Sequence, residues 1–321
     1  MTRSRIALML LMLLALAGAS LAVGDIALAS LWRDPALARE VLVEIRLPRF
    51  LLAAAAGAVL ALSGAALQGY LRNPLASPDI VGASGGAALG AVGTAYYLGL
   101  AGSMAMAAGG IAGALAALGL LLALAGRGAS TTTLILAGVA LTSLAGALLN
   151  VALTFAPSPF AVYDIMFWLL GSFEDRGVAH LLIGLPPMLV GGALLLGCRR
   201  ALDALVLGED VAATLGVNVA ATRRTIVAGS ALAVGGSVAV AGVIGFVGLV
   251  VPHLVRPMVG HRPGAALGPS ALAGAALLVL ADLLARMPVA DRTLPIGVVT
   301  AIVGAPFFLK LVLRSRRDGR P

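Results

Sequence analysis

Long apolar stretches alternate with short polar segments along the whole chain. An α-helix rises 1.5 Å per residue, so about 20 apolar residues cross the roughly 30 Å hydrocarbon core of a bilayer. The pattern therefore predicts an all-α, polytopic membrane protein with about ten transmembrane helices. The predicted spans are residues 6–23, 50–69, 82–100, 103–125, 131–155, 180–198, 225–242, 243–260, 267–285 and 296–313.

The two ends of this pattern need separate arguments. Arg3 and Arg5 precede the first apolar run, and small residues follow it, so a cleaved signal peptide is one interpretation. We favour an uncleaved first helix because many more spans follow. Residues 25–49 are polar and are expected to form a loop or a surface helix. The division of 225–260 into two spans rests on the Gly and Pro residues that interrupt it.

Composition supports a membrane protein. Hydrophobic residues make up 60% of the chain, charged residues 11%, and the mean hydropathy is +1.05. Soluble domains carry about 25% charged residues, so these charges are too few to cover a soluble surface. The net charge of +8 does not indicate nucleic-acid binding, because the arginines cluster at predicted helix ends. A single cysteine, Cys198, excludes an intramolecular disulfide.

The distribution of arginines predicts the orientation. An even number of spans places both termini on one side of the membrane, and most arginines fall on that side. Because cytoplasmic loops carry the excess of Arg and Lys, we expect both termini to be cytoplasmic. The longest polar segment inside the chain, residues 201–221, then faces the cytoplasm as well.

Residues 201–221 divide the chain into two halves. They contain Asp203, Glu209 and Asp210, and a pair of arginines stands on each side. We expect one membrane domain over residues 1–321, with a first half of about 1–200, a cytoplasmic connector at 201–221 and a second half of about 222–321. A mixed apolar face on the connector favours contact with a partner protein over a solvated loop.

The two halves show a weak internal symmetry. Ala/Gly/Ser-rich helices follow Arg49 and Arg224, each precedes a Pro-containing break, and the two run in opposite directions. Repeats of opposite orientation are typical of transporters. The alternative, that any two Ala/Gly-rich helices look alike, stays open at this point.

No enzyme constellation is apparent. His180, His253 and His261 are scattered and have no Cys or carboxylate at metal-ligand spacing. A Walker A loop needs a Gly-Lys step, but Leu309 precedes the only lysine, so ATP hydrolysis by this chain is excluded. Asp282 is the one clear acid within a predicted span, and Arg286 lies one turn later. The simpler interpretation is that these two side chains form an ion pair. The functional interpretation is that Asp282 carries a proton across the membrane.

Ordered motifs give the chain a resemblance to a known family. They are Arg46-Leu-Pro-Arg49, Leu62-Ser-Gly-Ala-Ala-Leu-Gln68, Arg72-Asn-Pro-Leu-Ala76, Gly82-Ala-Ser-Gly-Gly-Ala87, Gly208-Glu-Asp-Val-Ala-Ala-Thr-Leu-Gly-Val217, Gly245-Phe-Val-Gly-Leu-Val-Val-Pro-His253, Ala281-Asp-Leu-Leu-Ala-Arg286, Leu294-Pro-Ile-Gly-Val-Val-Thr300 and Gly304-Ala-Pro-Phe-Phe308. From about residue 40 to 313 the chain resembles FecCD/BtuC-type permeases. These are membrane subunits of bacterial ABC importers for iron-siderophores, haem or vitamin B12.

The resemblance implies a type II ABC importer permease with two inverted halves in the bacterial inner membrane. It implies a homodimer with the pathway between the subunits, two ATP-binding ABC subunits and a periplasmic substrate-binding protein. This chain would bind no cofactor or metal, and ATP and Mg would sit on the partner ATPase. Among the substrates we favour an iron-siderophore or haem over vitamin B12. The alternative is a gradient-driven secondary transporter with Asp282 as proton carrier.

The resemblance also assigns residues to three sites. Coupling to the ATPase falls to a pair of short helices with Gly208, Glu209, Asp210, Ala212, Leu215, Gly216 and Val217. A cytoplasmic gate falls to Asn73, Pro74, Leu75, Thr131 and Thr132, although Thr133 and Leu134 replace an expected Arg-Leu. Docking of the binding protein falls to Arg46, Arg49 and Arg286, for which local pairing with Glu44, Asp282 and Asp291 is the alternative.

Overall fold

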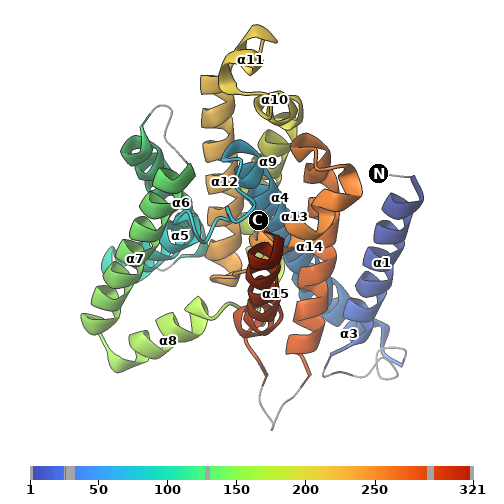
Figure 1. Cartoon of the computed structure of the whole chain (residues 1–321). Helices are drawn as coiled ribbons and strands as arrows, with labels where there is room; N and C mark the ends of the chain where they lie inside the picture. The colour runs from blue at the N-terminus through green and yellow to red at the C-terminus, as the bar shows by residue number, and fades with distance from the viewer. Residues whose placement is uncertain are drawn as a thin grey trace.

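The computed structural model describes residues 3–24, 26, 33–100, 102–126, 131–287 and 293–318, without the side chains of Arg3, Ala125, Thr131, Phe308 and residues 310–318. These residues form helices joined by short connections, and no strand occurs among them (Figure 1). The helices are α1 (Arg3–Ala22), α3 (Pro35–Arg39), η1 (Glu40–Arg46), α4 (Leu47–Tyr70), α5 (Ala83–Val92), η2 (Gly93–Tyr97), α6 (Ser103–Ala125), α7 (Thr131–Thr154), α8 (Pro159–Leu169), α9 (Val178–Gly197), α10 (Arg199–Leu205), α11 (Glu209–Thr214), α12 (Val219–Ala241), α13 (Val247–Val255), η3 (Arg256–Val259), α14 (Pro263–Ala285) and α15 (Ile296–Asp318).

Each of the ten predicted spans falls on a helix. Seven helices of the described chain are long and apolar enough to cross a membrane by themselves: α1, the continuous helix that ends with α4, α6, α7, α9, α12 and α14. The other three predicted spans fall on α5 with η2, α13 with η3, and the apolar part of α15. The chain is an all-α, multi-pass membrane protein, as the hydrophobic pattern predicted.

Two features differ in detail from the sequence-based expectation. Residues 35–46 are helical and run directly into α4, so one helix extends from Pro35 to Tyr70. Asp34 caps its start by accepting hydrogen bonds from the backbone N–H groups of Ala36 and Leu37. A further helix, α8, lies across the end of the molecule opposite α10 and α11 (Figure 1). It is too short to span, and Phe160 and Phe167 on it are exposed.

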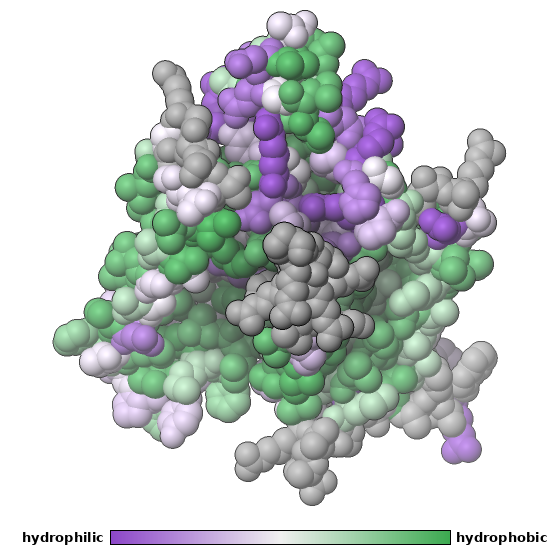
Figure 2. All heavy atoms as spheres, in the orientation of Figure 1, coloured by the Kyte–Doolittle hydropathy of each residue, from purple (hydrophilic) through white to green (hydrophobic). Residues whose placement is uncertain are grey.

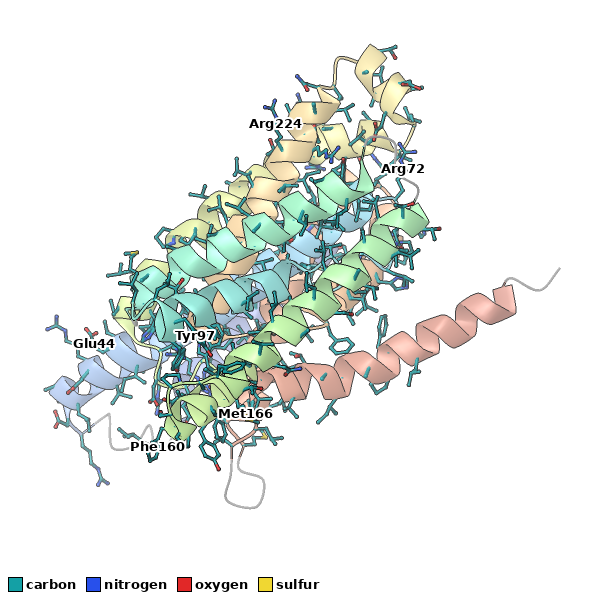
Figure 3. The ribbon with its side chains drawn as sticks, turned by 90° about the vertical axis from the view of Figure 1, so that its left-hand side faces the viewer. Glu44, Arg72, Tyr97, Phe160, Met166 and Arg224 are labelled. Carbon is teal, nitrogen blue, oxygen red and sulfur yellow. The ribbon has the colours of Figure 1, made fainter. Side chains whose placement is uncertain are left out.

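The two halves of the chain pack in the same way. The inner helix α4 packs against α13 and α14, and the corresponding inner helix α12 packs against α5 and α6. The two inner helices run in opposite directions: α4 starts near Glu44 and ends near Arg72, whereas α12 starts near Arg224 at the same end as Arg72 (Figure 3). This arrangement is that of two inverted halves.

Glycines allow the inner helices to come close to their neighbours. A Cβ atom on Gly57 of α4 would lie 2.2 Å from the backbone oxygen of Gly274 on α14. In the second half, a Cβ on Gly235 of α12 would lie 2.6 Å from Cα of Ile111 on α6. Any side chain at these positions would force the helices apart, which explains small residues here.

A short helix that starts inside the bundle follows the inner helix of each half. α5 begins after the segment 71–82 with Gly82 at φ +83°, and α13 begins after the segment 242–246 with Phe246 at φ +67°. The left-handed backbone suits glycine but is strained for phenylalanine. The broken helices place irregular backbone within the protein, where other protein groups can satisfy it.

Candidate functional site

The connector between the halves forms two short helices beyond the body of the bundle. α10 follows α9 after Cys198, and α11 runs from Glu209 to Thr214 (Figure 1). Gly208 and Gly216 flank α11 with φ angles of +112° and +84°, which glycine adopts without a Cβ clash. Glu209 and Asp210 occupy the first turn of α11, where negative charge favours the helix dipole. The pair of short helices expected from the resemblance is therefore present.

Apolar side chains are exposed on the connector. Leu207 and Leu215 are each 62% exposed, and Val206 and Val211 are exposed as well. Ala212, on the inner side of α11, is buried. Hydrophilic residues gather at this end of the molecule, and hydrophobic residues cover most of the body (Figure 2). The candidate membrane-spanning helices lie in the body, and α10 and α11 are outside those spans. Exposed apolar residues with a polar surround are typical of a protein interface.

The connector is hydrogen-bonded to α14 of the second half. Asp203 on α10 accepts hydrogen bonds from the guanidinium of Arg262, at 2.8 Å, and from the backbone N–H of Gly264, at 2.9 Å. The second bond satisfies an N–H at the start of α14. Gly264 has no room for a side chain, because a Cβ would lie 2.1 Å from the backbone oxygen of Arg199. α10 and the start of α14 are therefore held close together.

The other end of the connector leads into α12. Asn218 caps α12 by accepting a hydrogen bond from the backbone N–H of Ala221 at 2.9 Å. One turn later, Arg223 donates to the backbone oxygen of Leu122 at the end of α6, also at 2.9 Å. The connector is thus hydrogen-bonded to the start of α14 and leads directly into α12, which is itself hydrogen-bonded to the end of α6.

Cys198, between α9 and α10, is not a reactive site. It is buried, its thiol donates to the backbone oxygen of Leu194, and burial raises the pKa of the thiol. Reactivity of cysteine depends on the thiolate, so this residue is expected to be inert.

The candidate gate residues lie at the same end as the connector. Asn73 is buried, and its side-chain oxygen accepts a hydrogen bond from the backbone N–H of Leu75 at 2.9 Å. This bond forms a turn just after α4. Thr131 begins α7, although its side chain lies outside the described residues, and Thr132 is exposed. The segment after α4 also packs on α7, where the hydroxyl of Thr142 donates to the backbone oxygen of Asp79.

The three outer arginines lie close together at the opposite end. Arg46, Arg49 and Arg286 line one cavity of about 320 Å³, together with Ser172 and Glu174. The exposures of their side chains differ: Arg49 is 21% exposed and Arg286 is 9% exposed. Arg46 as a whole residue is only 4% exposed, and its guanidinium donates to the backbone oxygens of residues 21, 22 and 26. Its burial argues against direct contact between Arg46 and a partner.

Asp282 connects two of these arginines. It accepts hydrogen bonds from the guanidinium of Arg49 at 2.9 and 3.1 Å and from that of Arg286, so both carboxylate oxygens are occupied. The predicted pairing of Asp282 with Arg286 is confirmed, and Arg49 is added to it. Arg286 also donates to Ser20 on α1. Burial lowers the pKa of Arg286, and the negative charge of Asp282 opposes that shift.

Sequence reasoning missed a second acid within the protein. Asp79 accepts a hydrogen bond from the hydroxyl of Ser84 at 2.6 Å and another from the backbone N–H of Phe246. It therefore connects the break before α5 to the break before α13. The signal available in the sequence was an acid in a Pro- and Gly-rich stretch between two apolar runs, where irregular backbone is expected.

Comparisons with known proteins agree on the family. The sequence model of the FecCD transport family matches residues 5–314. The chain is 41% identical to an uncharacterized ABC transporter permease, YvrB, of Bacillus subtilis, over 91% of this chain and 84% of that protein. It is 43% identical to the vitamin B12 import system permease BtuC of Citrobacter koseri, over 85% of this chain and 83% of that protein. It is 42% identical to the cobalamin import system permease BtuC of Halobacterium salinarum, over 88% of this chain and 75% of that protein.

A solved structure has the same fold. It is described as an inward-facing conformation of a proposed metal-chelate type ABC transporter. It matches with a TM-score of 0.86 and 34% identity, covering 98% of this chain and all of the other. With the two inverted halves, the protruding connector and the family match over nearly every residue, the chain belongs to the FecCD transport family, as a membrane permease subunit of an ABC transporter.

Proposed function

We propose that the chain forms, as a homodimer, the translocation pathway of an ATP-driven importer in the bacterial inner membrane. Both termini and the connector face the cytoplasm. Two separate ABC subunits hydrolyse ATP, and this chain makes and breaks no covalent bond. A periplasmic binding protein delivers the substrate to the other face.

The observation that carries this proposal is the connector surface formed by Val206, Leu207, Val211 and Leu215. These side chains are exposed on α11 and on the turns that follow α10 and α11, beyond the body of the bundle. The neighbouring hydrogen bonds of Asp203 fix the same helices to α14. An apolar surface with a rigid attachment suits a partner that pushes on the bundle. Glu209, Asp210 and Gly216 on either side of it are proposed to set the orientation of the contact.

The gate is proposed at the cytoplasmic end of the pathway. The turn formed by Asn73, Pro74 and Leu75 would meet its counterpart, with Thr131 and Thr132, near the contact between the two copies. The proposal is supported by the position of this turn just beyond α4, on the side of the connector (Figure 3). Because Asn73 fixes Leu75 through a single side-chain hydrogen bond, the turn can shift as a unit when α4 moves.

Docking of the binding protein is proposed at the outer cavity. Arg49 and Arg286 place two positive charges against the single negative charge of Asp282, and Arg46 adds a third positive charge nearby. Glu174 also lines the cavity. This local excess of positive charge suits an acidic residue of a partner, and the planar arginine fork pairs with carboxylate. Arg49 is the most exposed of the three and is the proposed contact, with Arg46 and Arg286 holding the site in shape.

The substrate is proposed to be an iron-siderophore, haem or cobalamin. Two of the relatives described above are named for vitamin B12 or cobalamin import, and the structural neighbour for a metal chelate. These names give no support to our preference for an iron-siderophore or haem over vitamin B12. That preference therefore stays a prediction for direct uptake measurements.

A gradient-driven transporter with Asp282 as proton carrier is not favoured by the geometry. A carrier must release its carboxylate for protonation, but guanidinium groups occupy both oxygens of Asp282. The ion pair of Arg49 with Asp282 also joins α4 to the end of α14, so a proton carrier would have to break and re-form this link in every cycle.

Uptake into cells that produce the chain tests the proposal. The tagged chain is purified to identify the ATPase that accompanies it, and uptake of labelled cobalamin, haem and a ferric siderophore is compared. We expect one of the three to enter in an ATP-dependent manner. Uptake that survives ATP depletion and collapses with an uncoupler would contradict the proposal.

A further inference from the structure

A groove between α9 and α12 borders the connector, and Val217 is the one proposed site residue that lines it. Its volume is about 720 Å³, and it lies where both helices meet the connector. Small residues make the hollow: Ala193 and Gly197 on α9, and Ala221 on α12. Val190 and Leu194 line its apolar end, one to two turns into the membrane-spanning part of α9.

The other end of the groove is polar and positive. Arg200, at the start of α10, lines it and is exposed, and Asn218 and Thr222 lie opposite. Among the described residues that line the groove, none is acidic. The nearest acid on α10, Asp203, is already bound to Arg262 and to the start of α14. Arg200 forms no ion pair among the described residues, whose ion pairs involve Asp282 and Asp203.

The groove opens toward lipid. Leu189, Val190 and Leu196 on α9 are exposed, as expected for a helix that faces hydrocarbon. α9 ends at Gly197, and from Val190 to Gly197 its axis rises about 10 Å, which is about two-thirds of the hydrocarbon depth of one leaflet. The groove therefore extends from the membrane interface about two-thirds of the way into one leaflet, with its charge at the interface.

We propose that this α9–α12 groove binds one anionic phospholipid of the cytoplasmic leaflet. The phosphate of the headgroup pairs with Arg200, and one acyl chain lies along Val190, Ala193 and Leu194 against Ala221. Basic pockets between transmembrane helices on the cytoplasmic side suit anionic headgroups. A guanidinium binds phosphate with two parallel hydrogen bonds, so the charge also orients the lipid.

A lipid in this position would contact the moving parts of the permease. Val217 and Asn218 line the groove and form the link from the connector to α12. A lipid in the groove would touch α9, the start of α12 and the connector at once, so it would restrain their movement relative to one another. The assignment of the leaflet rests on the cytoplasmic orientation in the proposed function.

Native mass spectrometry of the full-length permease tests the site. The protein is extracted from nanodiscs containing phosphatidylglycerol and phosphatidylcholine in both leaflets, and the ratio of the two retained lipids is measured. We expect retention of phosphatidylglycerol in excess. Arg200→Glu should lower that excess about fivefold or more, because one basic residue near an anionic surface contributes about that factor. Arg200→Lys should keep most of it.

A second variant tests the acyl part of the groove. Ala221→Trp should fill the hollow and lower retention of the lipid while the charge of Arg200 is unchanged. Matched controls are Arg5→Glu, an exposed arginine on α1 at the same end, and Gly119→Trp, at an exposed position of α6 where an added Cβ meets open space. Both controls should retain phosphatidylglycerol as the parent does.

The outcomes separate this inference from the proposed function. Equal retention of the two lipids by the parent, or parental retention by both Arg200→Glu and Ala221→Trp, would overturn the site. If Arg200→Glu prevents assembly, Arg200→Gln gives the same comparison. Because lipid is offered in both leaflets, retention does not depend on orientation. If the permease selectively retains phosphatidylglycerol but supports no ATP-dependent uptake, the lipid site stands and the proposed function is contradicted.

Discussion

Arg49 on α4 and Asp282 on α14 are 233 positions apart in the chain, yet the guanidinium of one donates to both oxygens of the other. This pair joins an inner helix of the first half to a helix of the second half at the outer end of the bundle. Arg286 completes the group from the other side of Asp282. The side chain of Asp282 is almost fully buried, so its negative charge is stabilised by the positive charges of Arg49 and Arg286 rather than by water.

Removal of the Asp282 carboxylate should destabilise the permease strongly. Asp282→Asn leaves Arg49 and Arg286 facing each other without a compensating charge, and breaking a buried ion pair costs roughly 3–5 kcal/mol. We expect a large drop in the thermal unfolding midpoint of the detergent-solubilised protein. Arg262→Ala is the control, because its ion pair is exposed and such pairs contribute only about 0–1 kcal/mol. An unfolding midpoint for Asp282→Asn as high as that of the control would contradict the account of this group.

The contact between Gly57 and Gly274 should not tolerate a methyl group. In Gly57→Ala the new Cβ would lie 2.2 Å from a backbone oxygen on α14, so the two helices must separate. We expect a loss of stability of about 1–3 kcal/mol, as for overpacked cores, and a lower unfolding midpoint. Gly119→Ala on α6 adds the same methyl group into open space. It should be neutral or slightly stabilising, because alanine favours helix over glycine by about 1 kcal/mol.

The positions of the spans could be predicted from the sequence, but several details of the sites could not. Apolar runs are visible in one dimension because the bilayer demands them of every span. The burial of Arg46 depends on carbonyl groups of residues 21, 22 and 26, which approach only in the folded chain. The motif and the predicted topology therefore placed Arg46 at the end opposite the connector, but they did not predict its role in packing. α8 was missed because 11 residues carry too little signal for a span.

The two acids of the bundle make the same point. Asp282 was found because it interrupts a long apolar run and has Arg286 one turn away. Asp79 was missed because it lies in a Pro-rich connection, where an acid is unremarkable in sequence. Only the approach of the two helix breaks, through Ser84 and the backbone of Phe246, shows that the partly buried Asp79 side chain joins them.

Changes in the connector should uncouple ATP hydrolysis from uptake. Glu209→Arg reverses the charge at the start of α11, and Gly216→Val puts a branched side chain at φ +84°. We expect both variants to assemble as dimers but to transport at a small fraction of the parental rate while ATP is still hydrolysed. Glu44→Arg, the same charge reversal at an exposed position of the opposite end, is the control. Parental transport by both connector variants would show that the connector is not the coupling element.

The proposed gate should move with the nucleotide state. Cysteines introduced by Thr131→Cys in the two copies should form a crosslink without nucleotide and form less of it when ATP is bound. The background should be low, because burial raises the pKa of the only native thiol, Cys198, and leaves it unreactive. The parent chain, with Cys198 alone, is the control and should form no crosslinked dimer. The same crosslinking yield with and without nucleotide would count against a moving gate at Thr131.

Charge removal at Arg49 should slow the capture of the loaded binding protein. Arg46→Glu and Arg286→Glu do not test docking cleanly, because both residues are largely buried and hold backbone groups of the first helix and its connection. Arg49 is the most exposed of the three, so Arg49→Gln is the better change, and its unfolding midpoint is measured as well because the substitution also removes one partner of Asp282. Surface charge pairs act mainly on association and weaken with salt, so we expect a lower association rate constant with a flatter salt dependence.

Two controls separate docking from folding in this experiment. Arg49→Lys keeps the positive charge and should retain most of the salt dependence, although it loses the fork geometry. Arg39→Gln removes the same charge from an exposed position on α3, outside the cavity, and should bind as the parent does. Association is measured by surface plasmon resonance with the assembled complex, and basal ATPase activity reports its integrity. Association kinetics of Arg49→Gln equal to those of Arg39→Gln, at every salt concentration, would leave Arg49 with a structural role only.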